Sequence, residues 1–166
     1  KVKKIKKDGV LFMQLLDLNG QWEMKRTDEG IWRSAHVPGS VLKDLEDSGC
    51  IEDLFFRENQ SKALEICEYD YEYKKQFFVD ESMLLHDSVI LQCKGLDTLC
   101  DIFINGKKVS STSDMHRTYE INVKHILQKG ENTIRLVFLS PIKYCRQKNL
   151  ETQLYNSSYA LPGISH

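Results

Sequence analysis

Acidic side chains cluster between residues 65 and 72, and paired carboxylates are a common basis of general acid–base catalysis. Three of them are spaced two residues apart and alternate with aromatic residues. A period of two places alternate side chains on opposite faces of a β-strand. We therefore predict a strand with a solvated acidic face rather than a catalytic acid and base. The cluster consists of Glu65, Glu68, Asp70 and Glu72.

Other catalytic and ligand-binding patterns are missing from the sequence. No histidine has a second histidine or a cysteine two or four residues further along, and no Cys-x-x-Cys pair occurs. The nucleophile elbow Gly-x-Ser-x-Gly, the dinucleotide fingerprint Gly-x-Gly-x-x-Gly and a Walker lysine are also absent. The residues alone therefore predict no catalytic residue, no metal site and no cofactor.

The elements that must position any functional side chain are mostly short strands. Residues 99–104 alternate, with Cys100, Ile102 and Ile104 on one face, and Asn105-Gly106 then offers the two positive-φ residues of a type I′ hairpin turn. Similar alternation or apolar runs, bounded by turn residues, predict further strands. These lie at 10–16, 22–32 (a hairpin), 68–79, 88–93, 119–123 and 133–139.

A short helix is predicted at 41–48. Ser40 can cap its first turn and Gly49 can end it. Its apolar stripe predicts that Lys43, Asp44, Glu46 and Asp47 face water. Residues 50–65 show no period and are expected to form a long loop, and 143–153 can form a second helix. Many short strands with one or two short helices predict an all-β sandwich.

Length and composition bound the function. The 166 residues suit a single domain at 1–166, and 41% hydrophobic with 28% charged residues is ordinary for a globular protein. A net charge of −1 gives no reason to expect nucleic acid, and no apolar run could span a membrane. Five scattered cysteines favour free thiols in a reducing compartment, so we expect a cytoplasmic protein without a signal peptide.

Several segments, taken in order, resemble the start of family-2 glycoside hydrolases, in particular the β-mannosidase branch. The likeness covers nearly the whole chain, and its most distinctive wording is Gly-Leu-Asp-Thr followed by Ile-Asn-Gly and Met-His-Arg-Thr-Tyr. The matching segments are Leu18–Trp22, Val37–Val41, Leu45–Asn59, Asp70–Tyr73, Gly95–Leu99, Ile104–Gly106, Met115–Tyr119, Gly130–Ile134 and Phe138–Ile142.

This resemblance implies a galactose-binding-domain-like jelly roll, the sugar-binding domain of a larger multidomain enzyme. The enzyme would hydrolyse terminal non-reducing β-D-mannose residues with retention. Both catalytic glutamates, about 5 Å apart, would lie in a (β/α)₈ barrel of the same chain. The domain alone would be inactive, and its partners would be that barrel and, through the full enzyme, β-mannosides or manno-oligosaccharides. Alternatives are a free-standing carbohydrate-binding module, a domain that serves assembly alone, or the same domain from a β-galactosidase, β-glucuronidase or exo-β-glucosaminidase.

Two residues of the 50–65 loop are the candidate substrate contacts. Asn59 carries an amide that can bind sugar hydroxyls, and Arg57 can donate to a ring or hydroxyl oxygen. Asn59 could equally cap the turn that follows at 61–64. The sequence departs from the resembled pattern here, with Asp53-Leu54 in place of Asp-Pro and Asn59-Gln60 in place of Asn followed by an acid.

Overall fold

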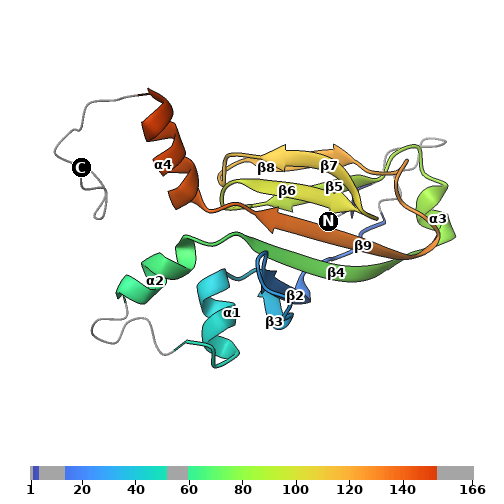
Figure 1. The fold of residues 1–166 in the computed structure, drawn as a ribbon. Helices are drawn as coiled ribbons and strands as arrows, with labels where there is room; N and C mark the ends of the chain where they lie inside the picture. Colours follow the sequence, from blue (N-terminus) through green and yellow to red (C-terminus); the bar gives the residue numbers. More distant parts are fainter. Residues whose placement is uncertain (1, 4–13, 52–59, 153–166) are drawn as a thin grey trace.

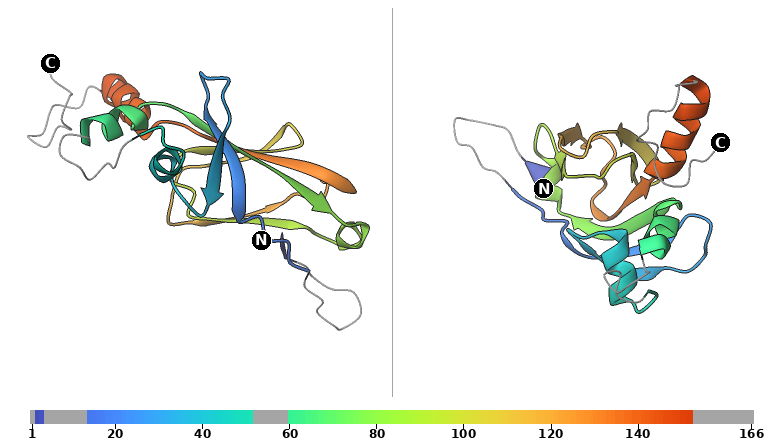
Figure 2. Two further views of the ribbon diagram at one scale, coloured as in Figure 1. Left: turned by 90° about the horizontal axis from the view of Figure 1, so that it is seen from below. Right: turned by 90° about the vertical axis from the view of Figure 1, so that its left-hand side faces the viewer.

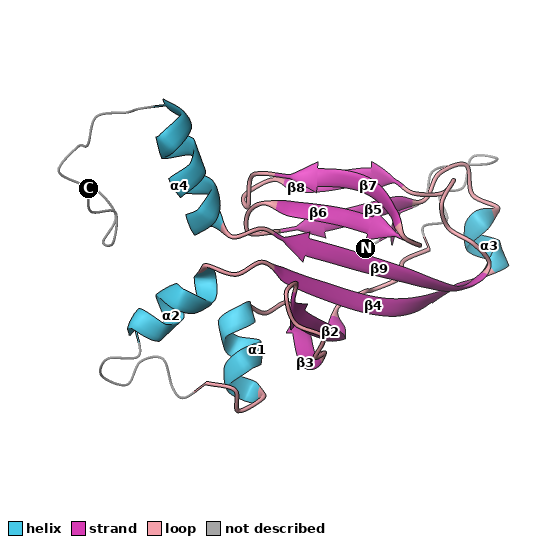
Figure 3. Cartoon of the chain, viewed as in Figure 1, coloured by secondary structure: helices cyan, strands magenta, loops and turns pink. Residues whose placement is uncertain are grey.

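The computed structural model describes residues 2–3, 14–51 and 60–152, and these form two β-sheets and four helices (Figures 1 and 3). The strand order is β1-β5-β8 in one sheet and β3-β2-β4-β9-β6-β7 in the other, and the pairings are antiparallel. This sandwich confirms the predicted all-β, jelly-roll fold class. The strands are β1 (Val2–Lys3), β2 (Gly20–Arg26), β3 (Arg33–Val37), β4 (Tyr71–Val79), β5 (Ile90–Lys94), β6 (Cys100–Ile104), β7 (Lys107–Thr112), β8 (Thr118–Asn122) and β9 (Gly130–Phe138), and the helices are α1 (Val41–Asp47), α2 (Gln60–Cys67), α3 (Glu81–Leu84) and α4 (Pro141–Thr152).

The helices gather at the two ends of the sandwich. Figures 1 and 2 show α1, α2 and α4 at one end, together with the β2–β3 turn, and α3 at the other. We call the first the helical end. The two long strands β4 and β9 pair from Tyr71↔Phe138 to Val79↔Gly130 and run between the two ends. No helix of the described ranges is long and apolar enough to cross a membrane.

The Asn105-Gly106 hairpin turn forms as predicted. Its two residues have φ values of 49° and 79°, and the burial of β6 alternates as expected, with Cys100, Ile102 and Ile104 in the core. Burial raises the pKa of the Cys100 thiol to about 12, so this cysteine is an inert core residue.

The turn is tied to the β8–β9 connection through a buried asparagine. Asn132 is 1% exposed and uses its whole amide. Its Oδ1 accepts from Asn105 Nδ2 at 2.8 Å and from the Gln128 backbone N–H at 3.0 Å. Its Nδ2 donates to the carbonyls of Gln128 at 2.7 Å and Gly130 at 3.0 Å. Asn105 in turn accepts from the Thr133 N–H and donates to the Ile126 carbonyl. This network joins two connections that are distant in sequence.

Helix α1 forms where predicted, but one of its faces was predicted wrongly. Ser40 accepts from the Lys43 N–H at 3.3 Å, and Gly49 follows the helix with φ 69°. Asp44, expected to face water, is 3% exposed. It accepts from the Tyr73 hydroxyl at 2.7 Å and from the His36 N–H at 2.9 Å. The short helix lies against β3 and β4, whose polar groups stabilise a carboxylate there.

The predicted acidic strand face is wrong for Glu72, which is 9% exposed. Because β4 is paired on both sides, Glu72 lies between Lys25 of β2 and Val137 of β9, and Arg135 contacts it at 3.4 Å. Asp70 is also engaged, since it accepts from the Ser140 N–H at 2.7 Å. Glu72 and Asp70 therefore form contacts with β9 and with the start of α4, rather than belonging to a solvated row of acidic side chains.

Other differences concern weakly periodic segments. Residues 14–16 are not in a strand, and the remainder of the predicted 10–16 strand lies outside the described residues. The predicted 50–65 loop is wrong from residue 60 onward, where α2 begins. The short α3 was not predicted either, whereas α4 matches the possible helix at 143–153.

Candidate functional site

A pocket of about 290 Å³ lies at the helical end, and we call it the helical-end pocket. It is bounded by β2, the start of β3, α1, α2 and the residues that lead into β4. The side chains that line it are Arg26, Glu29, Arg33, Leu45, Cys50, Ile51, Lys62, Glu65, Ile66, Tyr69 and Tyr71.

The sequence-predicted contacts Arg57 and Asn59 lie outside the described residues, so they stay predictions. The elements that precede and follow them in sequence both reach the pocket, because Ile51 and α2 contribute to its lining. The helical-end pocket is therefore the described cavity whose lining adjoins the predicted contacts in the sequence.

Two arginines from the β2–β3 hairpin bring positive charge to the helical-end pocket, and ion pairs hold their side chains in place. Arg26 donates to both carboxylate oxygens of Asp28, at 2.9 and 2.8 Å, and its guanidinium stacks over the Tyr69 ring at 3.7 Å from the centroid. The Asp28 hydrogen bond is the main reason that the pKa of Arg26 lies above its ordinary value. Glu29 lies between the arginines, 3.3 Å from Arg26 and 2.8 Å from Arg33. The donors are thus held in place before any ligand arrives.

The rest of the lining is largely apolar. Leu45 and Tyr71 are buried, while Ile51 and Ile66 are partly buried. Burial raises the pKa of Tyr71 to about 12, so its hydroxyl keeps its proton at neutral pH. An apolar lining with a few fixed polar groups is the common composition of small-molecule sites.

This arrangement suits binding rather than bond cleavage. A glycosidic general acid needs a carboxyl whose pKa is raised toward neutrality. Glu29, which lines the pocket, is instead ion-paired with two guanidinium groups. Beside the pocket, Arg26 holds the pKa of the Asp28 carboxyl below its usual value. A hydroxyl group of a ligand can accept a hydrogen bond from a guanidinium group and donate one to a carboxylate beside it. Over residues 2–3, 14–51 and 60–152, no group of three potential ligands could hold a metal ion.

Sequence reasoning missed Arg26, Arg33 and Tyr69 as pocket residues. The signal that could have found the arginines is the predicted hairpin at 22–32, because residues on either side of a hairpin turn lie close together. Tyr69 gave no comparable signal, since its contact with Arg26 depends on how β2 pairs with β4.

Comparison with known proteins identifies the family of the chain. It is 32% identical over 136 residues to a probable β-mannosidase of Caenorhabditis elegans, and the aligned region covers 81% of this chain and 15% of the relative. The structure is similar to that of a β-D-mannosidase from Dictyoglomus thermophilum, with a TM-score of 0.81 and 36% identity over 93% of this chain and 18% of that protein. An exo-chitosanase from Amycolatopsis orientalis shares the fold at 14% identity and a TM-score of 0.64, over 72% of this chain and 16% of that protein. The model of the glycosyl hydrolase 2 galactose-binding domain-like family matches residues 22–164, and the chain therefore belongs to that family.

Proposed function

We propose that this chain is the non-catalytic N-terminal jelly-roll domain of a retaining β-mannosidase that hydrolyses terminal non-reducing β-D-mannose residues. In that protein the domain packs on a catalytic barrel and lines one side of the sugar pocket with its helical end. The observation that carries the proposal is the likeness to the Dictyoglomus β-D-mannosidase over nearly all of this chain. The chain spans about 15–18% of the length of such relatives, so the bond-breaking groups belong to the remainder of the protein.

The surface of the helical end supports packing against another domain. Five of the nine exposed large apolar side chains of the described residues belong to the β2–β3 turn, to α2, or to α4 and the residues just before it. Figure 1 places these elements together at the helical end, and such a group favours an interface. The five side chains are Ile31, Leu64, Leu139, Tyr144 and Leu150.

We also propose a cytoplasmic location. The five cysteines are free thiols, and Cys93 and Cys100 are half-buried or buried in the core. Burial raises the pKa of Cys93 to about 11, which keeps the thiol protonated and slow to oxidise. A reducing compartment is where unpaired cysteines are ordinarily retained.

The first test measures hydrolysis of p-nitrophenyl β-D-mannopyranoside. We expect the longer protein to release p-nitrophenol and this chain alone to release none above a buffer blank, because the proposal assigns the bond-breaking groups to the remainder of the longer protein. The matched controls are the corresponding β-galactoside, β-glucuronide and β-glucosaminide, which separate the other family-2 activities. Faster release from one of these controls, or hydrolysis by this chain alone, contradicts the proposal.

The second test addresses Arg57 and Asn59. In the longer protein we expect Asn59→Ala and Arg57→Ala each to lower kcat/KM for the mannoside by about tenfold, the effect of about 1.4 kcal/mol of lost transition-state binding. Asn19→Ala is the matched control, because Asn19 is an exposed asparagine away from the helical-end pocket. If Asn59 only caps the following turn, its replacement lowers the melting temperature while the kinetics stay unchanged.

A further inference from the structure

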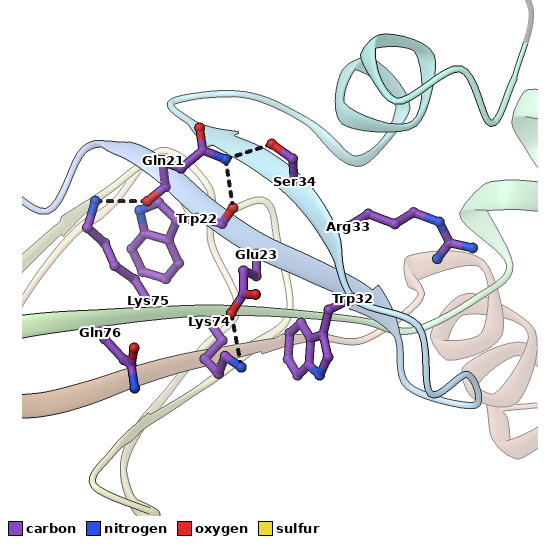
Figure 4. A pocket seen from close by; sticks show the side chains of 9 residues that line it. All are labelled: Gln21, Trp22, Glu23, Trp32, Arg33, Ser34, Lys74, Lys75 and Gln76. Atoms are coloured by element: carbon purple, nitrogen blue, oxygen red, sulfur yellow. Dashed lines mark hydrogen bonds and ion pairs between the residues drawn. The ribbon is translucent and has the colours of Figure 1, made fainter.

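A second hollow lies on the outer face of the six-stranded sheet, where β2 and β4 separate (Figure 4). The ladder between these strands ends at the pair Glu23↔Lys74. Beyond it the Lys75 Nζ spans the gap and donates to the carbonyls of Asn19 and Gln21, at 2.9 Å each. The volume is about 440 Å³, within the range of roughly 300–1,000 Å³ typical of ligand sites. We call this the outer-face hollow.

Its polar groups offer both donors and acceptors. Glu23 and Lys74 form an ion pair at 3.0 Å, with their side chains 55% and 30% exposed. Gln21 Nε2 donates to Ser34 Oγ at 2.6 Å, and Gln76 Nε2 donates to Glu131 Oε1 at 2.9 Å. Gln21, Gln76 and Ser34 are among the residues that line the hollow, and Figure 4 shows their side chains. Hydroxyl groups, which both donate and accept, fit such a mixed surface.

The charges of the hollow favour a neutral ligand. The lysines and the arginine that line it already have oxygen partners: Lys74 binds Glu23, Lys75 binds two carbonyls, and Arg33 binds Glu29 at 2.8 Å. An anionic ligand would have to displace these partners and would meet the exposed carboxylate of Glu23. A neutral polyhydroxylated ligand can add hydrogen bonds without breaking them.

Trp32 gives the hollow an apolar wall. Its indole is partly exposed and is held by two ammonium groups, with Lys74 Nζ 4.1 Å and Lys25 Nζ 4.9 Å from the ring centroid. Figure 4 shows Trp32 at one end of the hollow and the Gln21 and Gln76 amides at the other. A pyranose ring has the same division, with C–H groups on its faces and hydroxyl groups around its rim.

We propose that the outer-face hollow binds a short stretch of a neutral saccharide chain. Glu23, Lys74 and Gln76 hydrogen-bond its hydroxyl groups, and the part of the Trp32 indole that Lys74 and Lys25 leave exposed packs against its C–H groups. Because the hollow is open along the sheet, it accommodates internal sugar units as well as chain ends. This goes beyond the proposed function, since the hollow shares only Arg33 with the lining of the helical-end pocket and takes no part in bond cleavage.

The test titrates this chain with mannopentaose and follows its amide and indole N–H signals by NMR. The chain has two tryptophans, so two indole signals are expected, and Trp32→Phe assigns them. We expect saturable shifts of the Trp32 indole signal and of the amides of Glu23, Lys74 and Gln76. Glu23→Ala and Gln76→Ala should each weaken binding about fivefold, the effect of one lost hydrogen bond.

Glu81→Ala is the matched control, because Glu81 also forms an exposed ion pair with a lysine, Lys129, at the α3 end of the sandwich and does not line the hollow. It should bind mannopentaose as the parent chain does. The proposal is overturned by an absence of shifts, by shifts confined to helical-end residues such as Tyr69, or by equal affinity in the hollow variants. Competition by inorganic phosphate would also overturn it, as the mark of an anion site. These outcomes leave the hydrolysis test on the longer protein unaffected, so the two proposals fail separately.

Discussion

Replacing Asn132 with alanine should lower the free energy of unfolding by about 3 kcal/mol, because four hydrogen bonds made by a side chain that is 1% exposed are lost. Alanine leaves the Gln128 and Gly130 carbonyls without this donor, the Gln128 N–H without its acceptor, and Asn105 Nδ2 with one of its two acceptors. A buried unsatisfied group costs about 1–3 kcal/mol, whereas a bond that water can replace costs much less. Urea denaturation followed by the fluorescence of buried Trp22 measures the change.

The control for this prediction is Asn122→Ala. Asn122 is exposed, and its Oδ1 accepts a single bond, from the Lys124 N–H at 3.2 Å. Its replacement should change stability by less than about 0.5 kcal/mol. Asn105→Gly supplies a second comparison, since glycine keeps the positive φ of the turn while removing the side chain. Because Asn105 and Asn132 are in direct contact, the double variant should be non-additive by more than about 0.5 kcal/mol. Full additivity, or a loss below about 1 kcal/mol for Asn132→Ala, would contradict the network.

The hairpin at Asn105-Gly106 shows what local sequence determines. The turn needs two residues that tolerate positive φ, and the strand before it alternates with a period of two, so both features are visible within a few residues. The partner of Asn105 was not predictable in this way, because Asn132 lies 27 residues further along and becomes a neighbour only when β6 pairs with β9. Local rules thus gave the turn but not the network that holds it.

The candidate site shows the same difference between local features and contacts that depend on tertiary packing. A hairpin was predicted at 22–32, and Arg33 directly follows that range. The ion pairs of Arg26 and Arg33 with Glu29 are local to the β2–β3 turn, whereas the stacking of Arg26 on Tyr69 depends on tertiary packing. Helix α2 escaped prediction because its apolar residues follow no clear helical period, so its position depends on packing that a single segment does not reveal. The prediction of the family succeeded for another reason, because it used the order of many short segments along the chain.

Helix periodicity predicted wrongly that Asp44 faces water. Its replacement should give the second large loss of stability that we expect. Asp44→Ala should destabilise the fold by about 3 kcal/mol, since the Tyr73 hydroxyl and the His36 N–H both lose a charged acceptor in the core. Asp47→Ala is the matched control: Asp47 belongs to the same helix but pairs with Lys43 at the surface, and its loss should cost less than about 0.5 kcal/mol. Thermal or urea unfolding of the parent chain, Asp44→Ala and Asp47→Ala measures the two losses of stability.

The Tyr73 partner gives this prediction a pH signature. Burial, and then the hydrogen bond to Asp44, hold the pKa of Tyr73 far above its ordinary value near 10. In the unfolded chain the same phenol ionises near pH 10, so the stabilisation is complete below that pH and declines as the pH rises further. Tyr73→Phe should therefore be less stable than the parent chain at neutral pH by about 1–2 kcal/mol. It should also lose stability less steeply above pH 10. Equal slopes for the two proteins in that range would show that the Tyr73 hydroxyl is hydrated rather than bound to Asp44.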